Sequence, residues 1–377
     1  MYNKNMNAEE IRNKLIKIIE IYTSFSDKNT IDELLVNIAN RSISVLNCER
    51  VSIFILDKSK RILWSKVALG TNRIEIPVDE GIAGYSANHN EIIKIDNAYK
   101  DPRFDRRIDQ KTGFKTKSIL CIPLISLNGE VLGVVEAINK KSGVFTDEDI
   151  QMTKIFCSTI SRAIENSKFY QELQNTFYSF LEALAYAIDA RHPITAGHSR
   201  RVTLVAMRIG KAFGLADEDI EKLRIAGLLH DIGKIGISDS VLKKPGRLTD
   251  EEYEEIKKHP LITYYILMKV KFPKDLEDIP FIASHHHERP DGKGYPDGLT
   301  DKEIPLLAKI LAVSDVFEAL SARREYKKPY DLTTIKRILI EERGKQMNAE
   351  VVDKFLEIID DVYREIKDDQ QRGISDF

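Results

Sequence analysis

The feature that most constrains the fold is a long central stretch without helix-breaking residues. Neither proline nor glycine occurs between Asp147 and Arg191, and these two residue types interrupt helices most strongly. The stretch predicts one connecting helix over residues 147–190. Within it, steps of four and three residues mark a heptad seam: Met152, Phe156, Thr159, Ala163, Asn166, Tyr170, Leu173, Phe177, Phe180 and Leu184.

The heptad seam allows two interpretations. The helix either pairs with a second copy in a parallel homodimer or packs only on its own domains. The polar residues Thr159 and Asn166 predict that any paired segment is short.

Composition narrows the class of protein. A chain of 377 residues predicts two or three domains, and the net charge of -2 favours neither a nucleic acid polymer nor a membrane as partner. No apolar run approaches ~18 residues and no apolar signal core opens the chain, so we expect no transmembrane helix. Cys48, Cys121 and Cys157 are widely spaced, which is typical of reduced core thiols and predicts a cytoplasmic protein.

The histidines separate the two halves of the chain. Of the eight, only His89 precedes residue 190. Histidines together with a few aspartates are typical ligands of more than one divalent metal, and a Gly-rich turn lets a phosphate approach backbone N–H groups. The C-terminal half is therefore predicted to hydrolyse a phosphate ester. Its histidines are His192, His198, His230, His259, His285, His286 and His287.

The N-terminal half has a mixed α/β pattern. Helical periodicity covers residues around 7–23 and 30–47, and a short helix is expected from Gly81 beside a pocket. Asn128-Gly129 predicts a tight hairpin between the last two of four strands. The four predicted strands are 51–56, 62–67, 118–124 and 131–138.

This order of elements resembles the GAF sensory domain over a core of about residues 20–168, within a sensor domain predicted for residues 1–168. GAF domains of cyclic-nucleotide phosphodiesterases and cyclases carry a pattern that is matched here by Asn139, Lys140, Phe145, Asp147 and Glu148. The resemblance implies a small-molecule ligand, a nucleotide or another compound, at these residues. Thr146 followed by acids also fits a helix N-cap, so a purely structural domain stays open.

The C-terminal half, residues 170–377, is predicted to be all-α. Proline and glycine gather in loops at 243–247 and 289–298. The predicted helices are 199–213, 217–229, 250–256, 306–322, 333–342 and 349–368.

Several segments of this half resemble the HD-GYP domain, a subgroup of the HD metal-dependent phosphohydrolases. They follow one another in the family's order across most of residues 185–365: Thr195-Ala196-Gly197-His198-Ser199, His230-Asp231-Ile232-Gly233-Lys234, the stretch 286–296, the run 304–315 and the run 319–327. The resemblance implies hydrolysis of cyclic di-GMP to linear pGpG, with GMP as the product of a second cut.

The resemblance also assigns the metal ligands. His198, His230, Asp231 and Asp315 are implied for one ion, and Asp231, His259, His286 and His287 for the other, with Asp231 as the bridge. Mixed histidine and carboxylate ligands suit iron and manganese and tolerate zinc. Some members carry a glutamate ligand to a third metal where this chain has Ile194. We therefore expect two ions, iron or manganese.

Catalysis is assigned to Asp231 and Lys234. Paired metals acidify water and neutralise charge on a phosphate. Lys234 follows Asp231 by three residues, so on a helix it would share the face of Asp231 and add positive charge. The implied substrate contacts are Lys234, Gly294, Tyr295, Pro296, Arg324 and Lys327.

Single residues keep simpler interpretations. His230-Asp231 alone fits a hydrogen-bonded core pair, and His259 before Pro260 fits a helix cap. The family pattern has two histidines before Glu288, so His285 is expected to lie outside the ligand set, although an exchange with His286 stays open. His192 is expected at the surface or at the entrance of the site. Arg289 either takes part in substrate binding or pairs with Glu288 or Asp291.

The expected protein is a homodimeric sensor and effector. Three alternative functions are open: an HD hydrolase of other nucleotides such as guanosine polyphosphates or cyclic GMP-AMP, a binding module for cyclic di-GMP or partner proteins without turnover, and a mixed-valent di-iron oxygenase. The Gly-Tyr-Pro motif at Tyr295 argues against the first and third, and the intact ligand set argues against the second.

Overall fold

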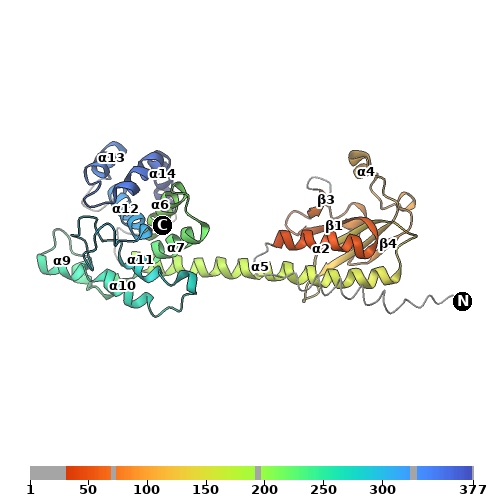
Figure 1. The fold of residues 1–377 in the computed structure, drawn as a ribbon, viewed down its shortest axis with the longest axis horizontal. Coiled ribbons are helices and arrows are strands. Elements are labelled where there is room, and N and C mark those ends of the chain that lie inside the picture. The colour runs from red at the N-terminus through yellow and green to blue at the C-terminus, as the bar shows by residue number, and fades with distance from the viewer. Residues whose placement is uncertain (1–30, 69–73, 192–196, 323–328, 376–377) are drawn as a thin grey trace. The chain divides into compact units, whose positions relative to one another are not determined.

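The computed structural model describes residues 31–68, 74–191, 197–322 and 329–375. It divides into two compact units, Met1–Leu173 and Gln174–Phe377. Figure 1 shows the elements of each unit. The helix predicted around residues 7–23 lies outside the described residues. Among the helices of the described ranges, none combines the length and the apolar character that crossing a bilayer requires.

The first unit is built on one antiparallel sheet of six strands in the order β3-β2-β1-β6-β5-β4. The four predicted strands are confirmed, and the β5–β6 turn contains Gly129 with φ 81°. Strands β3 and β4 have three residues each, too few to show an alternation in sequence. The bounds are β1 Cys48–Asp57, β2 Ile62–Ala68, β3 Glu75–Pro77, β4 Ile93–Ile95, β5 Ile119–Ile125 and β6 Val131–Lys140.

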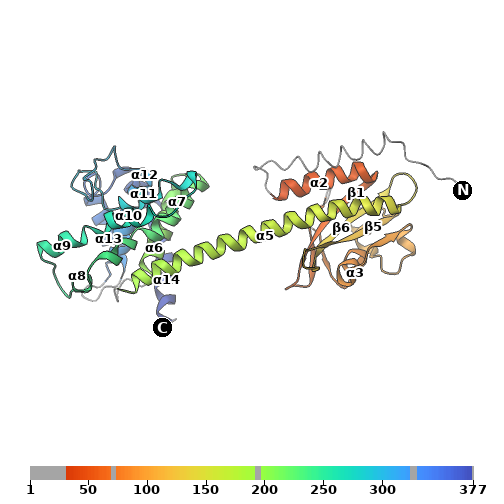
Figure 2. The ribbon, with the colours of Figure 1, turned by 90° about the horizontal axis from the view of Figure 1, so that it is seen from below.

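Helices cover both faces of this sheet. Figure 2 shows α2 (Ile31–Leu46) and the first part of α5 (Asp147–Asp189) on one face and α3 (Gly81–His89) on the other. The short elements η1 (Ala98–Lys100) and α4 (Arg106–Thr112) precede β5. Alternate residues of β6 serve the two faces, because Val135 packs in the α2 and α5 core while Val134 packs in the α3 core. The predicted α/β architecture of the GAF half is confirmed.

Helix α5 confirms the predicted connecting helix. Thr146 caps it, since the Thr146 Oγ1 accepts from the Asp149 N–H at 3.3 Å and the Asp149 carboxylate accepts from the Thr146 N–H at 2.8 Å. In its first part the seam follows the second interpretation: Phe156 is buried against the sheet of its own domain, and Met152 packs against the same core. The later seam residues Tyr170, Leu173, Phe177 and Phe180 are exposed.

The described part of the second unit consists of helices with two isolated β-bridges, which confirms the all-α prediction. Its core is aliphatic and aromatic, with Phe317 and Phe355 packed edge to face. After α5 the elements are α6 His198–Ala212, α7 Asp217–Leu229, η2 Ile232–Gly236, α8 Asp239–Leu242, α9 Asp250–Ile256, α10 His259–Leu267, η3 Lys274–Leu276, α11 Ile279–Ser284, α12 Leu306–Ser321, α13 Leu332–Glu341 and α14 Ala349–Ser375.

Candidate metal centre

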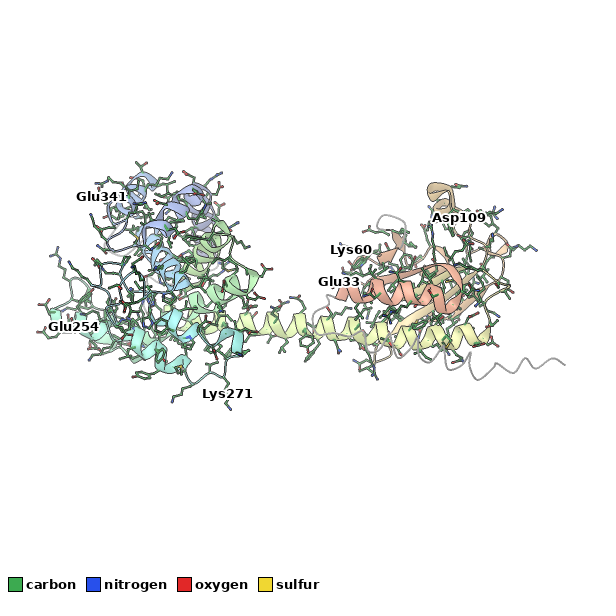
Figure 3. All side chains as sticks on the ribbon, viewed as in Figure 1. Glu33, Lys60, Asp109, Glu254, Lys271 and Glu341 are labelled. Carbon is green, nitrogen blue, oxygen red and sulfur yellow. The ribbon has the colours of Figure 1, made fainter. Side chains whose placement is uncertain are left out.

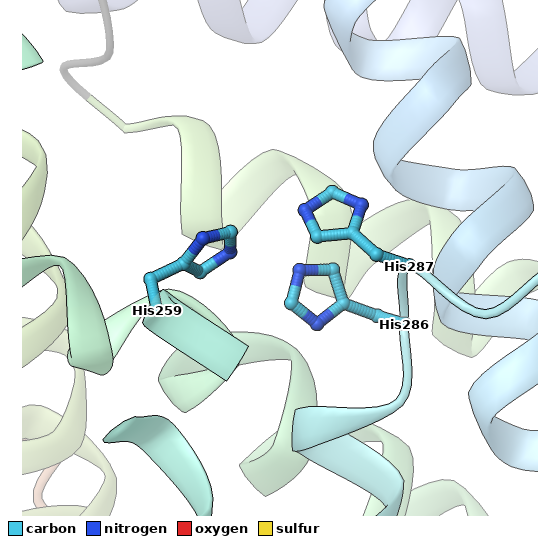
Figure 4. A group of neighbouring side chains, drawn as sticks. All are labelled: His259, His286 and His287. Carbon is cyan, nitrogen blue, oxygen red and sulfur yellow. The ribbon is translucent and has the colours of Figure 1, made fainter. Parts of the chain in front are cut away.

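The predicted metal ligands come together in the second unit from six different elements. His198 begins α6, His230 ends α7, and Asp231 precedes η2. His259 is the first residue of α10, whose N-cap is Lys258, so the cap interpretation of His259 is wrong; Asp315 lies in α12. His286 and His287 follow α11, and Figure 4 shows their rings beside that of His259.

The ligand atoms form overlapping groups. Within each of three sets the candidate atoms lie within 4.8 Å of one another. The sets are His259, His286 and His287; His198, His230 and Asp315; and His230, Asp231 and His286.

Asp231 lies between two groups of imidazoles. Its Oδ2 is 3.5 Å from the His198 Nε2 and 3.4 Å from the His230 Nε2. Its Oδ1 is 3.3 Å from the His259 Nε2. Asp315 Oδ1 adds to the first group, 3.4 Å from the His198 Nε2. Each oxygen of Asp231 therefore faces a different set of nitrogens, which is the arrangement of a carboxylate that bridges two cations.

Three imidazoles are oriented by backbone carbonyls. The Nδ1 atoms of His230, His259 and His286 each lie 2.7 Å from the carbonyl oxygen three residues earlier. Donation from Nδ1 leaves Nε2 as the unprotonated nitrogen. In the described part of the chain these three Nε2 atoms are buried without a hydrogen-bond partner. Buried polar atoms of this kind cost about 1–3 kcal/mol each, so the residues fit a metal that would accept their lone pairs.

The charges of the centre favour cation binding. Burial would raise the pKa of Asp231, but Lys234 and the neighbouring histidines hold it well below its usual range. Burial and the neighbouring imidazoles lower the pKa of His286 and bring that of His287 to about 3. The carboxylate is therefore ionised and these imidazoles are neutral, as metal ligands must be.

His198 has a separate carboxylate partner that the sequence analysis missed. Its Nδ1 lies 2.6 Å from Glu318 Oε2, and Glu318 Oε1 accepts from Arg201 Nε at 2.8 Å. Burial lowers the pKa of His198, but the surrounding carboxylates, led by Glu318, raise it to about 10. The free imidazole is therefore protonated, and an ion at its Nε2 would displace that proton while Nδ1 keeps its bond to Glu318. Glu318 follows Asp315 by three residues on α12, so the spacing of one helical turn was its signal in the sequence.

The turn after His230 differs from the expectation of an α-helical face. Residues Ile232–Gly236 form a 3-10 helix, in which positions three apart are eclipsed. Lys234 Nζ therefore contacts the Asp231 carboxylate directly. Thr263 of α10, which the sequence analysis missed, fastens this turn: its Oγ1 accepts from the Gly233 N–H at 3.0 Å and donates to the His230 carbonyl at 2.9 Å.

The loop after the histidine triplet is organised by Glu288. Its buried carboxylate accepts three backbone N–H groups at 2.7, 3.0 and 2.9 Å, from Asp297, Gly298 and Leu299. A Cβ on Gly294 would lie 2.4 Å from the backbone nitrogen of Arg289. Close packing of the loop's own backbone therefore requires glycine at this position.

The remaining predicted residues of the centre can be placed as follows. The Tyr295 ring lies 4.7 Å from that of His287, and Pro296 follows it in the same loop. His285 is held apart from the ligand cluster by Asp297, 3.0 Å from its Nε2, and Arg289 pairs with Asp291. Outside the described residues lie His192, Ile194, Arg324 and Lys327.

The first unit has a cavity on the α3 face of its sheet, of roughly 790 Å³ including space open to solvent. Apolar side chains form most of its wall. Asp109, labelled in Figure 3, accepts hydrogen bonds from the Tyr99 hydroxyl at 2.9 Å and the Thr116 N–H at 2.7 Å. Glu136 also lines the cavity, and burial together with Asp109 raises its pKa to about 7.

The residues of the GAF pattern lie away from this cavity. Asn139 Oδ1 accepts from the Lys117 N–H at 2.6 Å, and Lys140 Nζ donates to Asp149 at 2.6 Å. Phe145 is fully buried, and Asp147 and Glu148 are exposed at the start of α5. These contacts tie the end of β6 to the start of α5. Ligand binding by the five residues stays a prediction without support from the cavity.

Comparison with known proteins agrees with this division. Residues 30–164 match the family model of the GAF domain and residues 182–351 that of the HD domain. A cyclic di-GMP phosphodiesterase of Thermotoga maritima is 40% identical over 54% of this chain and 55% of its own length. The 3'3'-cGAMP-specific phosphodiesterase 2 of Vibrio cholerae is 34% identical over 55% of this chain and 40% of its own length.

A third relative is the cyclic di-GMP phosphodiesterase response regulator RpfG of Xanthomonas campestris, 41% identical over 47% of this chain and 46% of its own length. The chain thus spans about half the length of the curated relatives that it matches. Both matched regions coincide with the folds described above, so the chain carries a GAF domain followed by an HD domain, in the order that its motifs predict.

Proposed function

We propose that the chain is a metal-dependent phosphodiesterase of the HD-GYP type that hydrolyses cyclic di-GMP. The observation that carries this proposal is Asp231, whose Oδ2 faces His198 and His230 and whose Oδ1 faces His259. Among the described residues, the buried Nε2 atoms of His230 and His259 have no hydrogen-bond partner. A two-metal centre is suited to phosphodiester hydrolysis. Relatives named cyclic di-GMP phosphodiesterases support the choice of substrate.

Two ions, iron or manganese, would be held by the seven ligands His198, His230, Asp231, His259, His286, His287 and Asp315. When bound, they supply an acidified water and positive charge for the phosphate.

The protein's own groups complete the chemistry. Burial opposes the charged form of Lys234, but Asp231 raises its pKa, so the ammonium is available to a phosphate oxygen or to the leaving oxygen. Burial also raises the pKa of Tyr295, which keeps its hydroxyl protonated, and its ring offers a face for a guanine. Glu318 orients His198 through its Nδ1. Gly294, Pro296, Arg324 and Lys327 are kept as proposed substrate contacts.

A second candidate substrate is 3'3'-cGAMP, because a relative 34% identical to this chain carries that specificity in its name. The two dinucleotides share the phosphodiester ring and one guanine. The same metal centre would therefore hydrolyse either dinucleotide, and the preference for one of them depends on how the protein recognises the second base.

Turnover of a nucleotide panel tests the proposal. Protein reconstituted with iron or manganese is incubated with cyclic di-GMP, 3'3'-cGAMP and a guanosine polyphosphate, and the products are separated by chromatography. We expect cyclic di-GMP to open to pGpG, with slower formation of GMP. If the metal-loaded protein binds cyclic di-GMP without opening it, the protein is a sensor and not an enzyme. If it turns over 3'3'-cGAMP faster than cyclic di-GMP, then 3'3'-cGAMP is the substrate.

We further propose that the GAF domain regulates hydrolysis by binding a small molecule in the α3-face cavity. The apolar wall suits a ring or an aliphatic body. No described side chain bonds to Glu136, and its ionisation is disfavoured by burial and Asp109, so an N–H group of the ligand would stabilise it. Loss of ligand binding in Glu136→Gln, measured by calorimetry once a ligand is found, is the expected result.

A homodimer is proposed on the exposed apolar residues of α5. Tyr170, Leu173, Phe177 and Phe180 follow the heptad spacing and have solvent-exposed side chains, and large apolar side chains in such a row favour pairing with a second copy. Sedimentation of the full chain should give twice the monomer mass, and Tyr170→Glu with Phe177→Glu should return it to the monomer.

A further inference from the structure

The last residue of α5, Asp189, is hydrogen-bonded to the segment that carries the proposed metal ligand His198. Asp189 is buried, and its carboxylate accepts from the Ser199 N–H at 3.1 Å and from the Ser199 hydroxyl at 2.9 Å. Ser199 directly follows His198 at the start of α6. Asp189 therefore sets the position of this first turn relative to the end of α5.

Arg191, two residues further along, is hydrogen-bonded to the turn that follows Asp231. Its Nη1 donates to the Lys234 carbonyl at 2.7 Å, and its Nη2 donates to the Ile237 carbonyl at 3.1 Å and to Asp239 at 2.6 Å. The Lys234 N–H in turn donates to the Asp231 carbonyl at 3.0 Å. The planar guanidinium thus holds the turn that presents Asp231 and Lys234.

The last turns of α5 also pack close to the two segments that carry His198 and Asp231. Tyr178, Leu181 and Ala185 belong to the core of this unit, and the Arg224 guanidinium of α7 lies 3.3 Å from the centre of the Tyr178 ring. A gap too small for a water molecule is all that lies between the last turns of α5 and the two ligand segments. Its lining includes Leu184, Ala185 and Ile188 from α5, and Ser199, Asp231 and Ile232 from the ligand segments.

We propose that Asp189 and Arg191 are positioning residues that set the spacing between His198 and Asp231, so that a shift or rotation of α5 changes the rate of hydrolysis. The distance under their control is the 3.5 Å between the His198 Nε2 and Asp231 Oδ2. A misplacement of ~1 Å in a catalytic centre costs on the order of 100-fold in rate. These contacts give the proposed phosphodiesterase a physical route for regulation, and only the predicted changes in rate rest on that proposed function.

The first experiment weakens each bond separately. Arg191→Ala should lower kcat roughly tenfold to a hundredfold, as supporting residues around metal ligands do, with little change in KM. Arg191→Lys keeps the charge and should recover part of the loss. Ser199→Ala removes only the hydroxyl bond to Asp189 and should give a smaller loss. The matched control is Arg200→Ala, because Arg200 is exposed on α6 and pairs only with Asp369 among the described residues.

Two readouts separate positioning from folding and from the choice of substrate. Chelator competition measures metal affinity without any substrate, and Arg191→Ala should weaken it. Urea unfolding of the metal-free protein checks the fold: Arg191→Ala should still unfold cooperatively, and its free energy of unfolding should fall below that of Arg200→Ala only by the ~0.5–1.5 kcal/mol that each lost hydrogen bond contributes. Wild-type metal affinity together with wild-type kcat in Arg191→Ala and Ser199→Ala would overturn the inference. If cyclic di-GMP is not a substrate, metal affinity still decides the role of the two residues.

A double-mutant cycle tests the coupling to α5. Insertion of two residues after Lys168 changes the helical phase by about 200°. If α5 acts through the hydrogen bonds of Asp189 and Arg191, the insertion should change kcat and metal affinity in the wild type. It should then have little further effect in Arg191→Ala. An equal change in both backgrounds, or no change in the wild type, would refute this route.

Discussion

Replacement of Gly233 by alanine should spread the metal centre apart. A Cβ at this position would lie 2.0 Å from the His259 carbonyl oxygen and 2.6 Å from the Thr263 nitrogen, whereas real Cβ contacts stay beyond 3.0 Å. Both neighbours are backbone atoms, so neither can rotate away. Gly233→Ala must therefore move η2 and α10 apart by about 1 Å, an overpacking that costs about 1–3 kcal/mol of stability.

The displacement acts on the ligands because both elements begin at the centre. Asp231 precedes η2, His259 begins α10, and their facing atoms are 3.3 Å apart. We expect metal affinity to fall roughly 10–100-fold. The rate should fall on the order of 100-fold.

The assay is metal content by elemental analysis after dialysis against graded chelator, together with phosphodiesterase rate and urea unfolding. Gly210→Ala is the matched control, since the nearest atoms to its Cβ would all be side-chain ends: those of Ile220 and Leu223 at 2.7 Å and that of Leu215 at 3.4 Å. That variant should lose stability but keep its metal affinity. Wild-type affinity and rate in Gly233→Ala would refute the reasoning.

Four further predictions concern the ligands, the catalytic lysine, the sensor and the helix. Asp231→Ala should lose both ions because it faces both groups of imidazoles, whereas His259→Ala should empty mainly one site; elemental analysis decides, and full metal content in Asp231→Ala would contradict the bridge. Lys234→Ala should keep its metal but lose roughly tenfold or more in kcat, and an unchanged rate would remove Lys234 from the mechanism. Folding raises the pKa of Glu136 from 4.5 to about 7, so its contribution to stability is present below pH 4.5 and lost as pH rises through about 7. In urea unfolding, the free energy of unfolding of Glu136→Gln should therefore exceed that of the wild type by about 1–3 kcal/mol above pH 7 and equal it below pH 4.5. A four-residue insertion after Lys168, close to one helical turn, should disturb the rate less than a two-residue insertion, and equal rates for the two would make α5 a simple tether.

Local rules determined much of this protein from its sequence. The absence of proline and glycine between Asp147 and Arg191 was enough to predict α5, because helix continuity depends on each residue's backbone. The motifs around His230 and His286 named residues that the fold brings together. The strands β1, β2, β5 and β6 followed from their apolar runs, which are long enough to be recognised.

Only the tertiary structure decided which partners these residues meet. The period of Phe156 is the same for a dimer seam and for a core, and the fold placed it in the core. The contacts of Glu318 with His198 and of Arg191 with the Lys234 carbonyl join segments far apart in the chain. The spacing of Glu318 from Asp315 marks Glu318 as a candidate, but only the fold shows which residues Glu318 and Arg191 meet. The orientation of the imidazoles likewise depends on carbonyls whose direction is set by α7, α9 and α11 after packing.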